Sequence, residues 1–198
     1  AIAGCVMLIY GSWWLVVLGA LIMLFALAYS AGPYPLSHHG LGDLAVIVFF
    51  GLIPVTFTCY LQTGTWECAD MALPTSVSVG LLAANVLIVN NYRDMEDDAS
   101  VGKRTTVVIF GRRFMSLAYL LSGISGMAVM IPVWSVLPLW SLLVPAVYLL
   151  LHYRTWMVLC QVQGAGLNPL LGRTAVNLLL FALMFLVACT CAPLPARM

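Results

Sequence analysis

Residues 72–98 read ALPTSVSVGLLAANVLIVNNYRDMEDD and pass from an uncharged run into a charged one. Positions 72–91 carry no Asp, Glu, Lys or Arg, and a run of about 20 such residues is long enough to cross the hydrocarbon core of a bilayer as a helix. Backbone groups in lipid must bond to one another, which leaves the helix as the conformation for such a run. The stretch therefore predicts a transmembrane helix that delivers a cluster of carboxylates to one membrane face.

The composition of the whole chain supports the same environment. Of its 198 residues 63% are hydrophobic, and only eight Lys or Arg and seven Asp or Glu residues are present. An ordinary soluble domain is about a quarter charged, and so few charges cannot form a polar exterior around a fold of this size. This excludes a soluble enzyme, a disordered chain and a nucleic-acid-binding protein. It leaves a multi-pass membrane protein whose partner is the lipid bilayer.

Similar apolar runs recur along the chain. They predict an all-α polytopic transmembrane helix bundle, a single domain over 1–198, with six full helices and one partial helix. The partial helix is the run 1–10, which is too short to span a bilayer. Because this run opens the chain without a preceding polar segment, we expect an N-terminally truncated fragment. The full helices are predicted at 13–30, 42–61, 72–91, 114–133, 136–153 and 174–192.

The basic residues indicate the orientation of these spans. With 1–10 counted as a span, the connections alternate between two sides, and one side receives 31–41, 92–113 and 154–173. Arg197 is the one basic residue on the other side. Because Lys and Arg accumulate in cytoplasmic loops, the first side is predicted to be cytoplasmic. It holds Arg93, Lys103, Arg104, Arg112, Arg113, Arg154 and Arg173.

The six cysteines show no recognisable pairing pattern. All but Cys68 lie in or beside apolar runs, and no Cys-x-x-Cys pair occurs. We interpret them as small apolar packing residues rather than as a disulfide framework.

The charged run that begins near position 90 is the main candidate for a chemical site. If the preceding helix continues through it, Asn90, Asp94 and Asp98 fall on one face. Carboxylates stacked on one face repel one another unless a cation binds them, and amide and carboxylate oxygens suit Mg²⁺. Lys103 and Arg104 follow closely, as a phosphate-binding site requires. A solvated juxtamembrane loop ordered by local ion pairs is the alternative interpretation of the same residues.

The connection 29–43 lies on the same predicted side of the membrane. Its distinctive side chains are those of Tyr34, His38 and His39, and they stand between prolines and glycines that stiffen and turn the chain. This pattern predicts either an interfacial loop with an aromatic anchor or the wall of a pocket for an aromatic substrate.

Two groups of short motifs on this face carry a family resemblance. They are NNYRD at 90–94, Asp98 and GKRT at 102–105 in one group, and YSAGPYPL at 29–36, GLGD at 40–43 and FFG at 49–51 in the other. The first group resembles the second Asp-rich motif of the UbiA superfamily of intramembrane aromatic prenyltransferases. The second resembles the Tyr-Thr-Gly-Gly-Pro-x-Pro-Leu loop of its 1,4-dihydroxy-2-naphthoate polyprenyltransferase branch, with Ser30 and Ala31 in place of Thr and Gly.

This resemblance implies a nine-helix fold with two Asp-rich motifs, of which the chain would supply helices three to nine and only the second motif. The implied reaction is Mg²⁺-dependent transfer of a polyprenyl group from polyprenyl diphosphate to 1,4-dihydroxy-2-naphthoate with loss of CO₂. The product would be demethylmenaquinone, made in menaquinone biosynthesis. The implied location is the bacterial inner membrane, with the active-site loops cytoplasmic.

The resemblance also implies a role for each candidate site residue. Asp94 and Asp98 would be the catalytic metal ligands, with Asp97 as a further ligand. The diphosphate would be bound by Lys103, Arg93, Arg104, Asn90 and Asn91. Tyr34 and Asp43 would bind the aromatic acceptor.

Two alternative functions stay open at the level of sequence. One is a prenyltransferase for another aromatic acceptor, such as 4-hydroxybenzoate or homogentisate. The other is a non-catalytic membrane carrier or scaffold. No Asp, Glu, Lys or Arg lies in the middle of a predicted span, which argues against an ion-coupled carrier.

Overall fold

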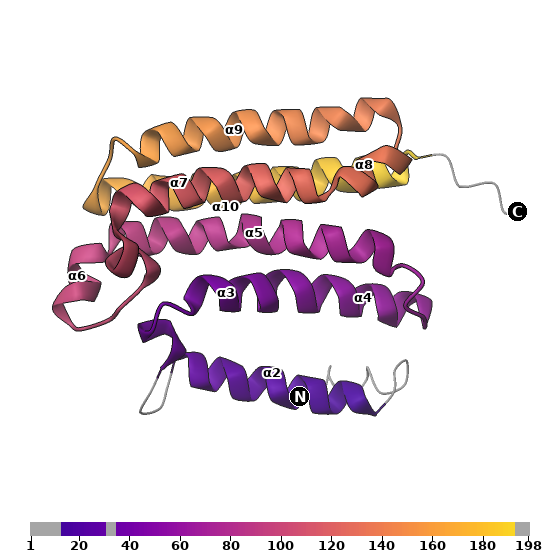
Figure 1. Cartoon of the computed structure of the whole chain (residues 1–198). Coiled ribbons are helices and arrows are strands. Elements are labelled where there is room, and N and C mark those ends of the chain that lie inside the picture. Colours follow the sequence, from indigo (N-terminus) through magenta and orange to yellow (C-terminus); the bar gives the residue numbers. More distant parts are fainter. Residues whose placement is uncertain (1–12, 31–34, 193–198) are drawn as a thin grey trace, which may run out of the picture.

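The computed structural model describes residues 13–30 and 35–192, and most of these are helical (Figure 1). This part of the chain contains no β-strand, which confirms the all-α prediction; a single isolated bridge joins His39 to Arg104. The elements are α2 (Trp14–Ser30), η1 (Leu36–His38), α3 (Gly42–Val46), η2 (Ile47–Leu52), α4 (Ile53–Thr63), α5 (Ala69–Arg93), α6 (Met95–Ser100), α7 (Thr106–Val129), α8 (Ile131–Val136), η3 (Leu139–Leu142), α9 (Leu143–Leu159), η4 (Gly164–Leu167) and α10 (Asn168–Thr190).

Each of the six predicted full spans corresponds to a helical segment. Among the described residues, five segments are long and apolar enough to cross a membrane. The sixth, α2, has 17 residues and is a shorter apolar helix. The partial helix predicted at 1–10 lies outside the described residues. The chain is therefore a multi-pass membrane protein. The five spans are Gly42–Thr63, Ala69–Arg93, Thr106–Val136, Leu139–Leu159 and Gly164–Thr190.

Two of these helices begin earlier than the sequence predicted. Helix α7 begins at Thr106 rather than at 114, because the Thr105 hydroxyl caps it by accepting a hydrogen bond from the Val108 amide at 3.4 Å. Helix α10 begins at Asn168 rather than at 174, with a proline in its first turn. Because Arg112 and Arg173 are charged, the sequence predicted that they lie in loops. Long basic side chains near a helix end can, however, reach the membrane surface from within the helix.

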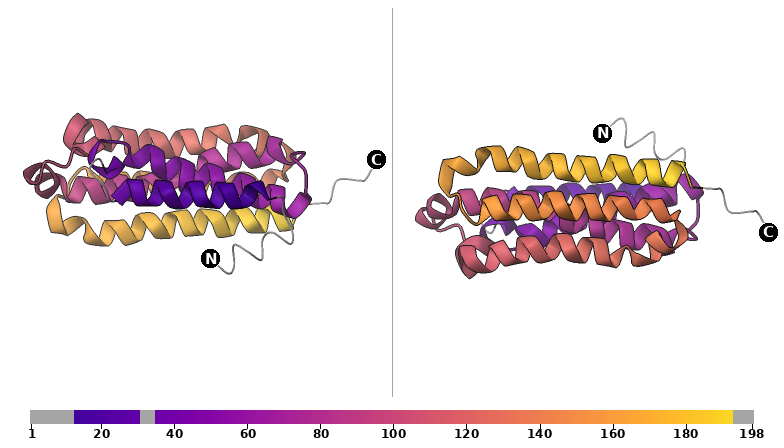
Figure 2. Two further views of the ribbon diagram at one scale, coloured as in Figure 1. Left: turned by 90° about the horizontal axis from the view of Figure 1, so that it is seen from below. Right: turned by 90° about the horizontal axis from the view of Figure 1, so that it is seen from above.

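Helix α5 is the centre of the bundle. It packs against η2 and α4 on one side and against α7 and α10 on the other, and Figure 2 shows the long helices lying side by side in an elongated array. The contact with η2 is made by two glycines. A Cβ added to Gly51 would overlap the Gly80 Cα, and one added to Gly80 would lie 2.7 Å from the Ile47 carbonyl oxygen. Backbone thus meets backbone at this crossing.

Replacing Gly51 by alanine is expected to destabilise the protein. The added methyl group meets backbone atoms of α5, which cannot rotate away, so the two helices must separate. Overpacking of this kind costs about 1–3 kcal/mol. Thermal unfolding of the full-length protein in detergent measures the loss. Gly19→Ala is the matched control, because nothing lies within 4 Å of a Cβ at Gly19; equal melting temperatures for the two variants would contradict the close crossing.

Three connections meet at one end of the bundle. Figure 1 shows the segment that precedes α3, the turn around α6 and the connection from α9 to α10 together at that end, and the connection from α4 to α5 at the opposite end. This is the alternation that the basic residues predicted. The two loops that carry the sequence motifs therefore share one face of the protein.

The interpretation of all six cysteines as packing residues was wrong for one pair. Cys59, in α4, is joined to Cys68, just before α5, by a disulfide. Helix α4 ends at Thr63, and the next residue, Gly64, has a φ of 70° that turns the chain. This turn brings the two cysteines together. Within the described residues Cys160, Cys189 and Cys191 are free. A spacing of nine residues across a helix end has no signature in sequence.

Candidate active site

The site is built where two connections of the chain touch. The Arg104 amide donates a hydrogen bond to the His38 carbonyl oxygen at 3.0 Å, which joins the segment before α3 to the segment before α7. Gly40 makes the close fit possible: its φ is +72°, and a Cβ there would lie 2.8 Å from the Ile109 side chain. The contact places the two motif-bearing loops over the end of α5.

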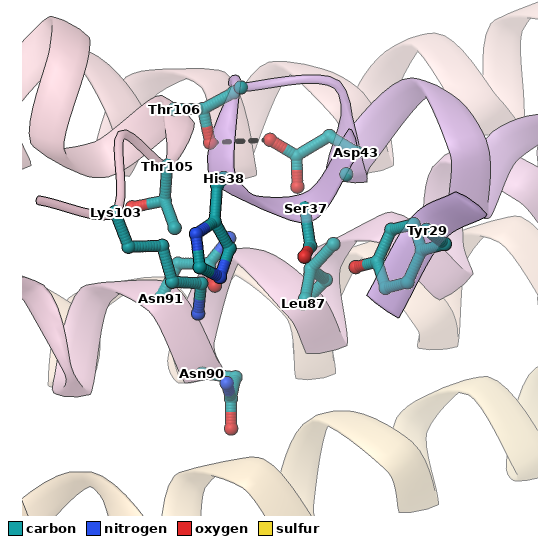
Figure 3. A pocket seen from close by; sticks show the side chains of 12 residues that line it. Tyr29, Ser37, His38, Asp43, Leu87, Asn90, Asn91, Lys103, Thr105 and Thr106 are labelled. Atoms are coloured by element: carbon teal, nitrogen blue, oxygen red, sulfur yellow. Dashed lines mark hydrogen bonds between the residues drawn. The ribbon is translucent and has the colours of Figure 1, made fainter. Parts of the chain in front are cut away.

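A cavity of about 300 Å³ lies between these loops and α5. Figure 3 shows polar side chains from four parts of the chain directed into it. Asp43 and Tyr29 stand at one side, and Lys103 and Asn91 stand at the other. The full lining is Tyr29, Ser37, His38, Gly40, Gly42, Asp43, Leu87, Asn90, Asn91, Lys103, Thr105 and Thr106.

The two amides come from the last turn of α5. Asn91 is buried, and Asn90 is half-buried and accepts a hydrogen bond from Arg93 Nη2 at 3.0 Å. Both line the cavity. Two successive residues can both line the cavity because it spreads around the end of the helix rather than along one of its faces.

The helix does not continue through the acidic run. Helix α5 ends at Arg93, Asp94 has φ −95° and ψ 13°, and the short helix α6 begins at Met95. The condition for a single face of Asn90, Asp94 and Asp98 is therefore not met. Arg93 provides a physical reason, because its Nε and Nη2 donate to the two oxygens of Asp94, at 2.6 Å each, and hold that carboxylate beside the helix end.

Among the carboxylates of the acidic run, Asp98 is the one bonded to a residue that lines the cavity. It is buried, and its Oδ1 accepts from Lys103 Nζ at 3.0 Å. Its Oδ2 is also buried and has no hydrogen-bond partner. Since buried polar atoms in folded proteins are nearly always bonded, this oxygen is free to accept a bond from a ligand. Lys103 thus connects Asp98 to the polar cavity.

Asp94 and Asp97 face a second hollow of about 550 Å³. The loop before α10 forms its other wall. The Arg93 guanidinium holds the pKa of Asp94 below its usual value. Within the described residues no group of three or more His, Cys, Asp and Glu side chains is arranged to hold a metal ion. The lining is Arg93, Asp94, Glu96, Asp97, Gly164, Ala165 and Asn168.

An ion pair that the sequence did not reveal fixes α6 in place. Arg112 Nη1 and Nη2 each donate to a carboxylate oxygen of Glu96 at 2.6 Å, and the guanidinium lies 5.5 Å from the centre of the Tyr92 ring. This pairing lowers the pKa of Glu96. Gly111, with φ 78°, interrupts α7 just before Arg112. The pair ties α6, and with it Asp98, to α7.

An apolar hollow adjoins the polar cavity on the bundle side. Its volume is about 380 Å³, and it shares Leu87 and Asn90 with the cavity. Asn90 thus stands at the boundary between a polar space and an apolar one. The lining is Val46, Phe50, Ala83, Val86, Leu87, Asn90, Leu171 and Leu178.

The structure brings together about half of the residues predicted for the site. Asn90, Asn91, Lys103 and Asp43 line the cavity, and Asp98 adjoins it through Lys103. The Arg104 side chain is exposed, and Tyr34 lies outside the described residues. Sequence reasoning assigned no role to the other polar lining residues. Tyr29 and Thr105 belong to the motifs that carry the family resemblance and His38 was conspicuous in its loop, whereas no motif contained Ser37 or Thr106.

The family model and the similar proteins agree on one protein family. The sequence model of the UbiA prenyltransferase family matches residues 1–165. The chain is similar to the 1,4-dihydroxy-2-naphthoate octaprenyltransferase of Haemophilus influenzae, with 35% identity over 172 residues, which are 85% of this chain and 54% of that protein. The enzyme of the same name from Escherichia coli is 35% identical over 175 residues, 86% of this chain and 56% of the relative.

A third relative is the 1,4-dihydroxy-2-naphthoate octaprenyltransferase of Mycobacterium tuberculosis, 37% identical over 111 residues, 56% of this chain and 37% of the relative. The chain spans about half the length of the first two relatives. No solved structure matches it significantly.

Proposed function

The chain belongs to the UbiA prenyltransferase family, and from this premise we propose that the full-length protein transfers a polyprenyl group from polyprenyl diphosphate to 1,4-dihydroxy-2-naphthoate, with loss of CO₂. The reaction would give demethylmenaquinol, the reduced form of demethylmenaquinone. The observation that carries the proposal is a polar cavity beside an apolar hollow, with Leu87 and Asn90 lining both. A prenyl diphosphate has the same two halves, a charged head and an apolar tail. The names of the relatives support the naphthoate as acceptor.

The diphosphate would bind at the Lys103 side of the cavity. An ammonium group and two amides donate hydrogen bonds to phosphate oxygens, and Lys103, Asn90 and Asn91 supply them. Arg93 and Arg104 are the further proposed donors. The Arg93 guanidinium is bonded to Asp94, and Arg93 follows Asn90 by three residues and Asn91 by two at the end of α5.

Mg²⁺ is the proposed cofactor, and the donor atoms of Asp98 fit it. One carboxylate oxygen of Asp98 is buried without a partner, and Mg²⁺ binds through one or two protein carboxylates and completes its shell with water and substrate phosphates. Asp94 and Asp97 are the other proposed ligands. To bind the ion, the Asp94 carboxylate would release the Arg93 guanidinium. When bound, Mg²⁺ neutralises charge on the diphosphate and makes it a better leaving group.

The remaining steps depend on side chains of the chain. Lys103 stabilises the charge that develops on the diphosphate as the allylic C–O bond breaks. Tyr29 and Leu87 offer ring and aliphatic surface for the flat acceptor. The apolar hollow, lined by Phe50, Leu171 and neighbours, holds the start of the prenyl tail and keeps water from the allylic cation.

We infer that the face bearing the site is cytoplasmic, in the inner membrane of a bacterium. Seven of the eight basic residues lie at that end, as cytoplasmic loops require. The disulfide between Cys59 and Cys68 lies at the opposite end, where an oxidising compartment would maintain it.

The proposed activity is tested with the full-length protein in detergent or vesicles. Supplied with polyprenyl diphosphate, Mg²⁺ and 1,4-dihydroxy-2-naphthoate, it is expected to release CO₂ and diphosphate in equal amounts and to form a prenylated naphthoquinol. 4-Hydroxybenzoate, offered in parallel, is expected to react far more slowly. Faster prenylation of 4-hydroxybenzoate would reassign the acceptor. Release of neither product would favour a carrier or scaffold.

A further inference from the structure

Only one of the two carboxyl oxygens of Asp43 has a hydrogen-bond partner in the protein. The Thr106 hydroxyl donates to its Oδ2 at 2.5 Å, whereas its Oδ1 is buried and has no hydrogen-bond partner. Figure 3 shows the bond to Thr106 on one side of the carboxyl group and the second oxygen turned toward the space beside Ser37 and Tyr29. A buried polar atom without a partner is rare in a folded protein. The open oxygen is therefore placed to meet a ligand in the cavity.

Asp43 differs in its partners from the acidic residues of the neighbouring loop. Among the described residues, the ion pairs at this end use Asp94, Asp98 and Glu96, and none uses Asp43. Its partner is a neutral hydroxyl group from a residue 63 positions away. A carboxylate held by one neutral donor keeps a free lone pair and no fixed counter-ion, which are the properties of a proton acceptor.

The location of Asp43 matches the acceptor half of the proposed reaction. Lys103 and Asn91 occupy the other side of the cavity, with the Leu87 and His38 side chains between the two groups (Figure 3). A diphosphate bound at Lys103 would leave the space next to Tyr29 and Asp43 for the aromatic ring. The hydroxyl groups of such a ring are the acidic protons nearest to Asp43.

We propose that Asp43 is a catalytic residue that takes the proton from the acceptor's ring hydroxyl group, and that Thr106 positions it; this rests on the proposed prenyl transfer to a hydroxynaphthoate. The O–H bond breaks and the proton passes to Asp43 Oδ1. Electrons from the oxygen move into the ring, and the neighbouring ring carbon, which carries the carboxylate, bonds to the allylic carbon. The C–O bond to diphosphate breaks with its electron pair leaving on diphosphate. The bond to the carboxylate then breaks, CO₂ departs, its electrons restore the aromatic ring, and Asp43 returns the proton to the ring oxygen.

Removal of the hydroxyl proton makes the ring a stronger nucleophile when the allylic cation forms. An ionised hydroxyl group donates more electron density to the carbon beside it than a neutral one does. General base catalysis of this kind accelerates reactions by about 10²–10⁴-fold. No net proton is taken up or released, because the proton that leaves the oxygen returns to it.

The test compares the full-length enzyme with Asp43→Asn, which has nearly the same shape and still accepts the Thr106 hydrogen bond but cannot take a proton. With Mg²⁺, polyprenyl diphosphate and 1,4-dihydroxy-2-naphthoate, kcat is expected to fall by about a hundred-fold, while the KM for the diphosphate stays within about twofold, since that substrate binds at the other side of the cavity.

The pH profile separates a proton acceptor from a structural residue. In Asp43→Asn the hydroxyl group must ionise on its own, so kcat is expected to rise about tenfold per pH unit below the pKa of that hydroxyl. The other titratable groups of the cavity, Tyr29, His38 and Lys103, are the same in both proteins. A kcat reduced equally at every pH would assign Asp43 a structural role and overturn the proposal, as would an unchanged kcat.

Thr106→Val is a second variant that tests the proposal if Asp43→Asn fails to fold. It keeps the carboxyl group and removes its donor, so a roughly tenfold lower kcat without the steep pH dependence is expected. A steep pH dependence in Thr106→Val, with none in Asp43→Asn, would overturn the assignment. If the unaltered enzyme prenylates no hydroxynaphthoate, the proposed function itself fails, and the role of Asp43 fails with it.

Discussion

Replacement of Asp98 by asparagine is expected to reduce prenyl transfer by the full-length protein on the order of 10³-fold. Asp98 is buried, bonded to Lys103 through one oxygen and open at the other. The amide has the same shape but no charge, so it binds Mg²⁺ poorly and leaves Lys103 without its counter-ion. Transfer rates measured across a Mg²⁺ titration should show both a lower maximum and a requirement for more Mg²⁺.

Asp70→Asn is the matched control for this variant. Asp70 is an exposed carboxylate in the first turn of α5, at the end of the bundle opposite the site. Its replacement changes the charge by the same amount and should leave transfer unaltered. Asp94→Asn adds a second comparison, because both Asp94 oxygens are bonded to Arg93. Near-normal turnover of Asp98→Asn at ordinary Mg²⁺ concentration would show that the metal is held elsewhere.

Replacement of Lys103 by glutamine is expected to lower kcat/KM for polyprenyl diphosphate by about 10²–10³-fold. The ammonium group lines the cavity together with the two amides, so its loss removes a charge that stabilises the leaving diphosphate. It also leaves Asp98 buried and unpaired. The double variant with Asp98→Asn is therefore expected to be less impaired than the sum of the two single losses, since the two residues form one ion pair.

Arg113→Gln is the control for Lys103→Gln. Arg113 lies at the same end of the bundle and is exposed, so its removal tests general attraction of an anionic substrate to a basic surface. Steady-state kinetics with each substrate varied in turn would separate the two sides of the cavity. A raised KM for the naphthoate with an unchanged KM for the diphosphate would place Lys103 on the acceptor side.

The helical segments could be predicted because each one is specified within its own residues. An apolar run such as 72–91 must form a helix in lipid whatever surrounds it. The seven basic residues likewise predicted which connections share a face, and the structure places those connections together. Helix ends were less predictable, because hydropathy does not show that Thr105 caps α7 or that Arg112 lies within it.

The site could be predicted only where its residues lie in one continuous run. Asn90, Asn91 and Lys103 belong to such a run, and they do line one cavity. Asp94 belongs to it as well, yet Arg93 holds it at a different hollow. The distinction depends on a break of the helix at one residue. A helical wheel cannot show that break.

The sequence by itself determined that this is a multi-pass helical membrane protein with its charged chemistry at one end. The tertiary structure decided which side chains meet: Asp43 with Thr106, Glu96 with Arg112, and Cys59 with Cys68. The physical reason is that a helix apolar all round has no polar face to mark the side on which its neighbours pack. Only the packing of α5 against its neighbours, close enough at Gly51 and Gly80 to exclude side chains, brings the two loops together over one cavity.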